Sequence, residues 1–360
     1  MKYRRLGNTG LIVSEVSLGT MQFGSKMNMG NLGQADTTKL VKAALDRGIN
    51  FIDTADVYSL GESETLVGNA LKGIREEIVL ATKVRLPMSQ NFNRSGATRV
   101  NIMRGIESSL KRLQTDYIDL YQVHGWDSNT PLEETLRTLD DLVRQGKVRH
   151  IGLSNLMSWQ AATAIMLQER MGLEKYATAQ MYYSLVGRGL EHEFQSFAQY
   201  YGIGILVWSP LAGGFLSGKY SRANPAAAGT RFSEAGQFVP FDKETGYKVI
   251  DVLKKVAQKR GVSAARVALA WVLGRPAVSS VIIAARKIEH LEDNIQAVDL
   301  VLSAEDVKLL DDASDPGTPY PKWMVLQLDV AEDPRPKVLH PERYAEGGIW
   351  KDLRGTKWQG

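Results

Sequence analysis

The chain has 360 residues, of which 44% are hydrophobic, enough to bury one large core or the cores of two ordinary domains. Its 44 Lys and Arg against 40 Asp and Glu give a net charge of +4, and both signs are spread along the chain, which argues against nucleic acid as the main partner. The absence of Cys excludes disulfides and thiolate nucleophiles, and no apolar stretch reaches the roughly 20 residues of a membrane helix, so we expect a cytoplasmic protein without a membrane segment.

The first predicted element is a β-hairpin in residues 2–15 that turns near Asn8-Thr9-Gly10 and covers the N-terminal end of the domain. Segments such as 37–48, 99–114 and 132–146 have amphipathic helical spacing and separate short apolar runs. Those runs, each predicted as a β-strand, are 16–20, 50–56, 78–84, 117–124, 148–155, 177–184, 204–211 and 279–285. Alternating strands and helices favour parallel pairing, and eight such units close a (β/α)₈ TIM barrel.

An open, doubly wound sheet is the alternative, but it would carry a Gly-rich phosphate turn after the first strand, and this sequence has none there. We therefore expect a single barrel domain, with the barrel in about 1–314. The loop 212–243, rich in Gly, Ala and Ser, follows the seventh strand, where active-site loops of barrels lie. The tail 315–360 contains Trp323, Trp350 and Trp358 and is predicted as an irregular segment packed on the barrel surface.

Four proton-transferring residues fall at or just after the ends of consecutive strands: Asp53, Tyr58, Lys83 and His124. In a TIM barrel this face holds the active site. Lys83 ends a buried run and needs a carboxylate partner, which Asp53 on the neighbouring strand can supply. We expect Lys83 to lower the pKa of Tyr58 from its usual ~10, so that Tyr58 donates a proton. His124 would hydrogen-bond the reacting oxygen.

Each of these residues alone has an ordinary explanation. Asp53 could cap a strand end, Tyr58 could be a loop aromatic, and His124 could be a core histidine with satisfied hydrogen bonds. Their joint placement on one face of the barrel favours a catalytic site.

The segments NFIDTADVYSLGESETLVGNAL, ATKV and YQVHGWD resemble, in order, the signature motifs of the aldo-keto reductase superfamily, and the likeness runs from the hairpin to about Asn294. The resemblance implies that Asp53, Tyr58, Lys83 and His124 are the catalytic tetrad. It is nearest to the potassium-channel β-subunit-like and bacterial reductases, since Trp208 stands where many relatives have Tyr. It implies reversible, NADPH-dependent reduction of aldehydes or ketones, with a hydride donated by the cofactor and a proton by Tyr58.

The same resemblance implies an NADP(H) site. Ser154, Asn155 and Gln180 would hold the nicotinamide carboxamide, Trp208 would stack on the ring, and Arg286 would bind the 2′-phosphate. The full set is Thr20, Met21, Ser154, Asn155, Gln180, Trp208, Ser209, Leu211, Gly213, Lys219, Arg231, Ala284, Arg286, His290, Asp293 and Asn294. Three of these depart from the family pattern: Ala284 replaces the usual Gly, His290 the common Gln and Asp293 the common Glu.

For the substrate pocket we predict Met21, Trp126, Tyr58, residues 86–97 and the tail, which suits a flat or cyclic apolar carbonyl compound. Two other functions fit the sequence: an NADP(H)-sensing regulatory subunit with little turnover, and a dehydrogenase that oxidises a cyclic alcohol. The sequence decides neither the direction of the reaction nor the natural substrate. A homo-oligomer is compatible with it.

Two other patterns do not support a site. GGFLSGKY has the glycines and lysine of a phosphate loop, but Tyr220 occupies the position of the magnesium-binding Ser or Thr. The five His include no His-x-x-x-His or Glu-x-x-His pair, so we expect no catalytic metal.

Overall fold

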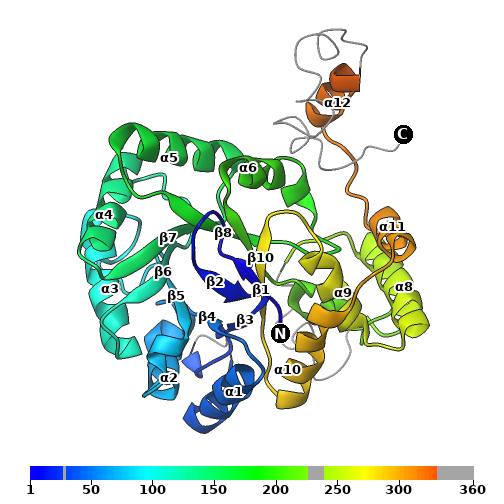
Figure 1. Cartoon of the computed structure of the whole chain (residues 1–360), viewed down its shortest axis with the longest axis horizontal. Helices are drawn as coiled ribbons and strands as arrows, with labels where there is room; N and C mark the ends of the chain where they lie inside the picture. Colours follow the sequence, from blue (N-terminus) through cyan, green and yellow to red (C-terminus); the bar gives the residue numbers. More distant parts are fainter. Residues whose placement is uncertain (27–29, 226–238, 331–360) are drawn as a thin grey trace.

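The computed structural model describes residues 1–26, 30–225 and 239–330, and eight parallel strands in it form a closed barrel (Figure 1). Strand β10 pairs with β3, which closes the ring and confirms the predicted (β/α)₈ architecture. In order around the barrel, the strands are β3 (Val16–Gly19), β4 (Phe51–Asp53), β5 (Val79–Val84), β6 (Ile118–Val123), β7 (Val148–Ser154), β8 (Tyr176–Tyr182), β9 (Gly204–Trp208) and β10 (Val278–Ile283).

The predicted hairpin, β1 (Tyr3–Arg5) and β2 (Ile12–Ser14), is antiparallel and lies across the barrel (Figure 1). Leu6 and Val13 are fully buried and pack with Phe51 and Val79, the first residues of β4 and β5. Gly7 has a φ of +56°, and a Cβ there would lie 2.2 Å from the carbonyl oxygen of Ala177. The hairpin therefore seals the N-terminal end of the barrel by apolar burial and close backbone contact.

The helices cover the outside of the barrel, as expected when parallel strands are joined by helical crossovers (Figure 1). In α3, for example, Thr98 caps the N-terminus by accepting a hydrogen bond from the amide of Asn101, and Ile102 and Ile106 face the core. The barrel helices are α1 (Gln34–Asp46), α2 (Glu62–Ala70), α3 (Arg99–Leu113), α4 (Leu132–Arg144), α5 (Ser158–Met171), α6 (Phe194–Tyr201), α8 (Lys243–Arg260), α9 (Ala264–Leu273), α10 (Ile288–Ile295) and α11 (Ala304–Ala313).

Short 3₁₀ turns interrupt several loops: η2 (Tyr58–Gly61), η3 (Arg75–Glu77), η4 (Phe92–Arg94), η5 (Gly189–Glu191), η6 (Ala212–Ser217) and η7 (Gln296–Asp299). Four of them, η2, η4, η5 and η6, follow barrel strands at the carboxyl-end face. Of these, η2 and η6 carry residues that the sequence assigns to the catalytic and cofactor sites.

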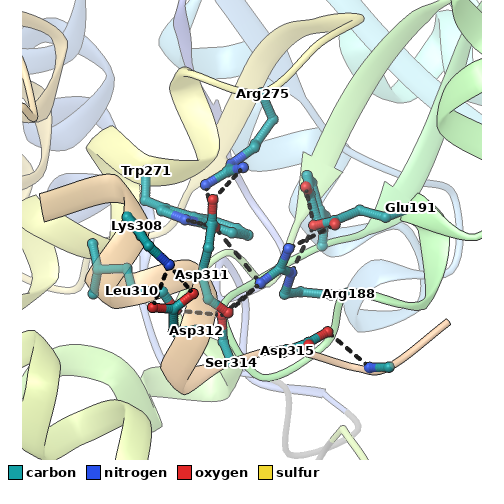
Figure 2. Close-up of polar contacts among 12 residues, drawn as sticks. Arg188, Glu191, Trp271, Arg275, Lys308, Leu310, Asp311, Asp312, Ser314 and Asp315 are labelled. Atoms are coloured by element: carbon teal, nitrogen blue, oxygen red, sulfur yellow. Dashed lines mark hydrogen bonds and ion pairs between the residues drawn. The ribbon is translucent and has the colours of Figure 1, made fainter. Parts of the chain in front are cut away.

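A network of ion pairs and hydrogen bonds ties the last barrel helix to the rest of the fold (Figure 2). Asp311 of α11 accepts hydrogen bonds from Trp271 Nε1 at 2.8 Å and from Arg275 Nη2 at 2.6 Å. Arg188, after β8, is paired with Glu191 and donates to Ser314 Oγ at 2.9 Å. This network joins α9, α11 and the loop after β8 at the point where the tail begins.

The described part of the tail contains a helix, α12 (Lys322–Val330), and the prediction of an irregular segment is wrong for these residues. Lys322 Nζ donates to the carbonyl oxygen of Glu191 at 2.6 Å, but Trp323, Met324 and Val325 remain exposed, and α12 lies at the periphery of the barrel (Figure 1). Straight-chain and apolar residues with good helix propensity account for the helix. Trp350 and Trp358 lie outside the described residues.

No helix in the described ranges is long and apolar enough to cross a membrane.

Candidate active site

A cavity of about 960 Å³ opens at the carboxyl ends of the strands. This is the face at which TIM barrels carry their active sites, because the loops after the strands converge there. Its floor and walls include residues in or shortly after each of the eight barrel strands, and among them are Thr20, Met21, Asp53, Tyr58, His124, Asn155, Gln180, Trp208, Ser209, Leu211, Gly213, Lys219, Ala284, Arg286, His290 and Asn294.

A buried ion pair lies next to the floor of the cavity. Lys83 Nζ is 2.6 Å from Asp53 Oδ1 and donates a second hydrogen bond to the carbonyl oxygen of Thr54 at 2.7 Å. The Lys83 side chain is 0% exposed and that of Asp53 is 3% exposed. A charge so deeply buried is tolerated only with a partner and further hydrogen bonds, and both are present here.

The second oxygen of Asp53 receives two amide donors. Gln180 Nε2 donates at 2.7 Å and Gln122 Nε2 at 3.1 Å. The sequence did not lead us to Gln122, which is also part of the site. Successive side chains of a strand point to opposite faces, so the position of Gln122 between Tyr121 and Val123 in β6 could have shown that it points into the barrel. Gln180, expected to hold a carboxamide, therefore also fixes the carboxylate of Asp53.

Tyr58 lies beside Lys83, with its hydroxyl 3.2 Å from Lys83 Nζ. Burial raises the pKa of Tyr58, and the positive charge of Lys83 opposes that effect without reversing it. The expectation of a lowered pKa is therefore wrong, because desolvation of the phenolate outweighs the attraction of the ammonium group. Tyr58 stays protonated at neutral pH and can act as a proton donor.

His124 stands edge-on to Tyr58, with ring centroids 5.9 Å apart. Its amide donates to the carbonyl oxygen of Val84 at 2.9 Å, which fixes the residue at the end of β6. Burial, together with the charges of Lys83 and Arg85, lowers the pKa of His124 to about 3. Its Nδ1 is buried with no hydrogen-bond partner among the described residues. A neutral imidazole that lines the cavity can orient a carbonyl oxygen through an N–H group without competing with Tyr58 as the acid.

The ends of β7, β8 and β9 form another wall. Trp208 Nε1 donates to Asn155 Oδ1 at 3.0 Å, and the indole packs on Tyr182 with centroids 5.1 Å apart. Asn155 Nδ2 in turn donates to Ser154 Oγ at 2.8 Å. Ser154 itself is buried, donates to the carbonyl oxygen of Gln180 and does not line the cavity. Ser154 therefore supports Asn155, and its contact with the nicotinamide carboxamide stays a prediction.

Exposed cationic side chains, which we call the basic wall, border the cavity at Lys219, Arg286 and Lys287. Among the described lining residues the one acidic side chain is Asp53, which is already paired with Lys83. A long cavity with a basic border fits the phosphates of a dinucleotide. Gly213 and Gly214 lie in the turn η6, before Lys219, with φ of 69° and 98°. Because they have no side chains, they leave room for a ligand near the backbone. Arg231 lies outside the described residues.

Residues 286, 290 and 294 share a face of α10 and its preceding turn, and that face borders the cavity. Asp293, three residues after His290, is not among the lining residues. It is paired with Arg266 at 2.6 Å and accepts a hydrogen bond from Ser263 Oγ at 2.6 Å. Asp293 therefore joins α10 to α9 and does not line the cavity, which differs from the role we expected.

The predicted substrate residues are divided between two places. Met21 lines the cavity, but Trp126 packs on Trp159, with centroids 5.9 Å apart, and is not a lining residue. Sequence spacing placed Trp126 near the strand end but could not show which way its side chain turns. The lining residues also include Gln22, Val57, Leu86 and Pro87, of which Leu86 and Pro87 belong to the predicted segment 86–97.

The chain is similar to proteins of one known family. A family model described as the aldo/keto reductase family matches residues 15–315. An uncharacterized oxidoreductase, YrpG, of Bacillus subtilis is 39% identical over 87% of this chain and 95% of its own length. The versiconal hemiacetal acetate reductase of Aspergillus parasiticus is 33% identical over 89% of this chain and 99% of its length. A probable voltage-gated potassium channel subunit beta of rice is 34% identical over 84% of this chain and 92% of its length.

Proposed function

This chain belongs to the aldo/keto reductase family, and from that premise we propose that it is an NADPH-dependent oxidoreductase that reduces aldehyde or ketone carbonyls to alcohols, with Tyr58 as the proton donor. The observation that carries the proposal is the buried chain of contacts from Asp53 through Lys83 to Tyr58, which ends at the cavity. It supports an acid whose proton is aimed at a bound oxygen.

In the proposed reaction, Tyr58, Lys83 and His124 have different roles. Tyr58 holds a proton on its hydroxyl at neutral pH, because burial raises its pKa. Lys83, held by Asp53, donates toward that hydroxyl and would stabilise the phenolate left after the proton moves to the substrate oxygen. Neutral His124 would hold that oxygen in place. When bound, the reduced nicotinamide supplies the hydride that reaches the carbonyl carbon.

The residues that would hold the nucleotide run from the neighbourhood of Tyr58 to the basic wall. Asn155, Gln180 and Trp208 offer amide groups and an aromatic face for the nicotinamide. The basic wall offers Lys219 and Arg286 to the phosphates, and Arg286 is the side chain we assign to the 2′-phosphate. Preference for NADPH over NADH rests on that assignment. We place the protein in the cytoplasm, with a small carbonyl compound as its partner.

One other function has an observation in its favour. The rice relative is named as a probable potassium channel subunit, so an NADP(H)-sensing subunit with little turnover is a second candidate. The complete Asp53, Tyr58, Lys83 and His124 set favours turnover, because a sensor needs no buried acid at its cavity.

A steady-state screen tests the proposal. The purified protein is assayed with aliphatic aldehydes, aromatic aldehydes, ketones and cyclic alcohols, each with NADPH or NADH and with the corresponding oxidised forms. Reduction of several carbonyls with NADPH supports the proposal. Tight NADPH binding without turnover of any compound favours the sensor, and turnover of cyclic alcohols alone favours the dehydrogenase.

A further inference from the structure

Arg85 has the most unusual backbone among the described residues other than glycine. Its φ is +123°, whereas the seven other such residues with positive φ lie between +49° and +62°. Those seven fall in or near the left-handed helical region, which side chains tolerate at some cost. A φ of +123° lies well beyond it, in a range that glycine occupies freely and other residues adopt rarely.

The side chain adds a second cost. Arg85 Nε is buried with no hydrogen-bond partner among the described residues, although burying an unpaired donor is unfavourable. Glycine would avoid both penalties at this position. A strained backbone and an unpaired buried donor at one residue point to a contribution other than the stability of the fold.

Arg85 joins two loops beside the cavity. Its carbonyl oxygen accepts a hydrogen bond from the amide of Gly96 at 2.8 Å, which closes the loop 85–96. Its guanidinium Nη2 donates to the carbonyl oxygen of Trp126 at 2.7 Å. Asp127 accepts from the amide of Ala97 at 2.7 Å, so the two loops are joined a second time.

These two loops carry wall residues of the cavity. Leu86 and Pro87 directly follow Arg85 and line the cavity, and His124 lies two residues before Trp126. Arg85 itself is not a lining residue. Its guanidinium also lies close enough to His124 to help keep that imidazole neutral, after the effects of burial and of Lys83. Its position therefore links Leu86, Pro87 and His124 without touching a ligand.

We infer that Arg85 is a positioning residue that determines carbonyl specificity: it fixes the loops 85–97 and 124–127 so that Leu86, Pro87 and His124 form one rigid wall. This role rests on the proposed function for its kinetic consequence, but the loop-fixing itself does not. The strained backbone of Arg85 is the energetic cost of this rigidity.

Two substitutions separate the strain from the guanidinium contact. Arg85→Ala removes the hydrogen bond to Trp126 and keeps the unfavourable φ, whereas Arg85→Gly removes both. We expect Arg85→Gly to have the higher midpoint of thermal unfolding, because glycine adopts this φ without strain. Gln114→Gly is the matched control: its φ is +55°, at the end of α3 that leads into β6 and away from the cavity. It should affect neither loop.

The first readout is hydrogen–deuterium exchange of the cofactor-free protein. Both Arg85 variants should exchange faster than wild type in peptides covering 85–98 and 124–131, while Gln114→Gly should not. The second readout is kinetic, with 4-nitrobenzaldehyde and butanal as probes. Both Arg85 variants should raise KM for 4-nitrobenzaldehyde by roughly three- to thirtyfold, with the Kd for NADPH within about twofold.

The pattern across variants distinguishes positioning from general stability. If KM followed stability alone, Arg85→Gly would be less affected than Arg85→Ala; we expect equal changes and an altered preference between the two aldehydes. Unchanged exchange in both loops would overturn the inference, as would wild-type KM values in an active enzyme. If the wild-type protein reduces no aldehyde or ketone in the steady-state screen, the proposed function fails, and the exchange comparison alone decides the role of Arg85.

Discussion

The charged groups around Asp53 and Lys83 differ in burial from those of the basic wall. Around Asp53 and Lys83, the ionisable groups are buried, and each is held by several short contacts. The basic wall consists of exposed side chains, Lys219, Arg286 and Lys287, at loop positions. A buried charge without its partner is strongly unfavourable, whereas an exposed cation costs little in any arrangement. In the proposed function, the geometry of proton transfer is therefore fixed by burial, whereas nucleotide preference would depend on a few exposed residues.

The largest effect should come from the proton donor. Tyr58→Phe keeps the ring and its packing against His124 but removes the hydroxyl at the cavity. General acids typically contribute about 10²–10⁴-fold, so kcat should fall by that amount while NADPH affinity changes by at most a few-fold. Steady-state kinetics and a cofactor titration check this. A Tyr58→Phe enzyme that reduces carbonyls at the wild-type rate would refute the mechanism.

Lys83→Met should lower turnover by a comparable factor, because Tyr58 then loses the positive charge that opposes the effect of burial on its pKa. The double variant Tyr58→Phe/Lys83→Met should be little worse than either single variant, since the two residues act as a unit. A double-mutant cycle on kcat measures this coupling. Additive losses would mean that Lys83 acts independently of Tyr58.

At the basic wall the expected effects are smaller and selective. Arg286→Ala should weaken NADPH binding by about one to two decades and NADH binding little, because a charge-assisted contact to a phosphate is worth roughly 1.5–3 kcal/mol. Equilibrium titrations with both cofactors provide the test, and Lys287→Ala is a neighbouring cationic control. Equal losses for NADPH and NADH would show that Arg286 does not recognise the 2′-phosphate.

A buried acid near the proton donor should make stability depend on pH. Burial, and then the neighbouring Glu64, raise the pKa of Asp56 from 3.8 to about 8. Because the folded state keeps this proton and the unfolded state releases it, the stabilisation is complete below the unfolded pKa and is lost as pH rises toward 8. Between about pH 5 and 7, the free energy of unfolding of wild type should fall relative to Asp56→Asn by about 1.4 kcal/mol per pH unit. Denaturant titrations with parallel pH profiles for both proteins would contradict this.

The smallest effect is expected at Trp208, at the end of β9. If Trp208 stacks on the nicotinamide, its fluorescence should be quenched when NADPH binds, and Trp208→Ala should remove most of the signal and weaken binding by roughly three- to tenfold. The chain has seven Trp, so the difference between wild type and variant is the quantity to measure. Undiminished quenching in Trp208→Ala would place the stacking residue elsewhere.

The sequence by itself determined the barrel, its sealing hairpin and the residues of the buried ion pair. Alternating apolar runs and amphipathic helices have few ways to close, and strand ends in a parallel barrel meet on one face, so Asp53, Lys83 and His124 were predictable from their phase alone. The motifs that resemble the aldo-keto reductase signature added the prediction of carbonyl reduction.

The tertiary structure alone decided how those groups behave and which side chains reach the cavity. The net pKa of Tyr58 depends on burial, which no spacing measures. Trp126 turns toward Trp159 and Asp293 toward Arg266, because each finds a partner from a distant part of the chain. Arg85 looks in the sequence like an ordinary residue at the end of a strand. Its strain becomes visible only when the backbone angle and the contact to Trp126 are known, since both arise from loops that meet in space.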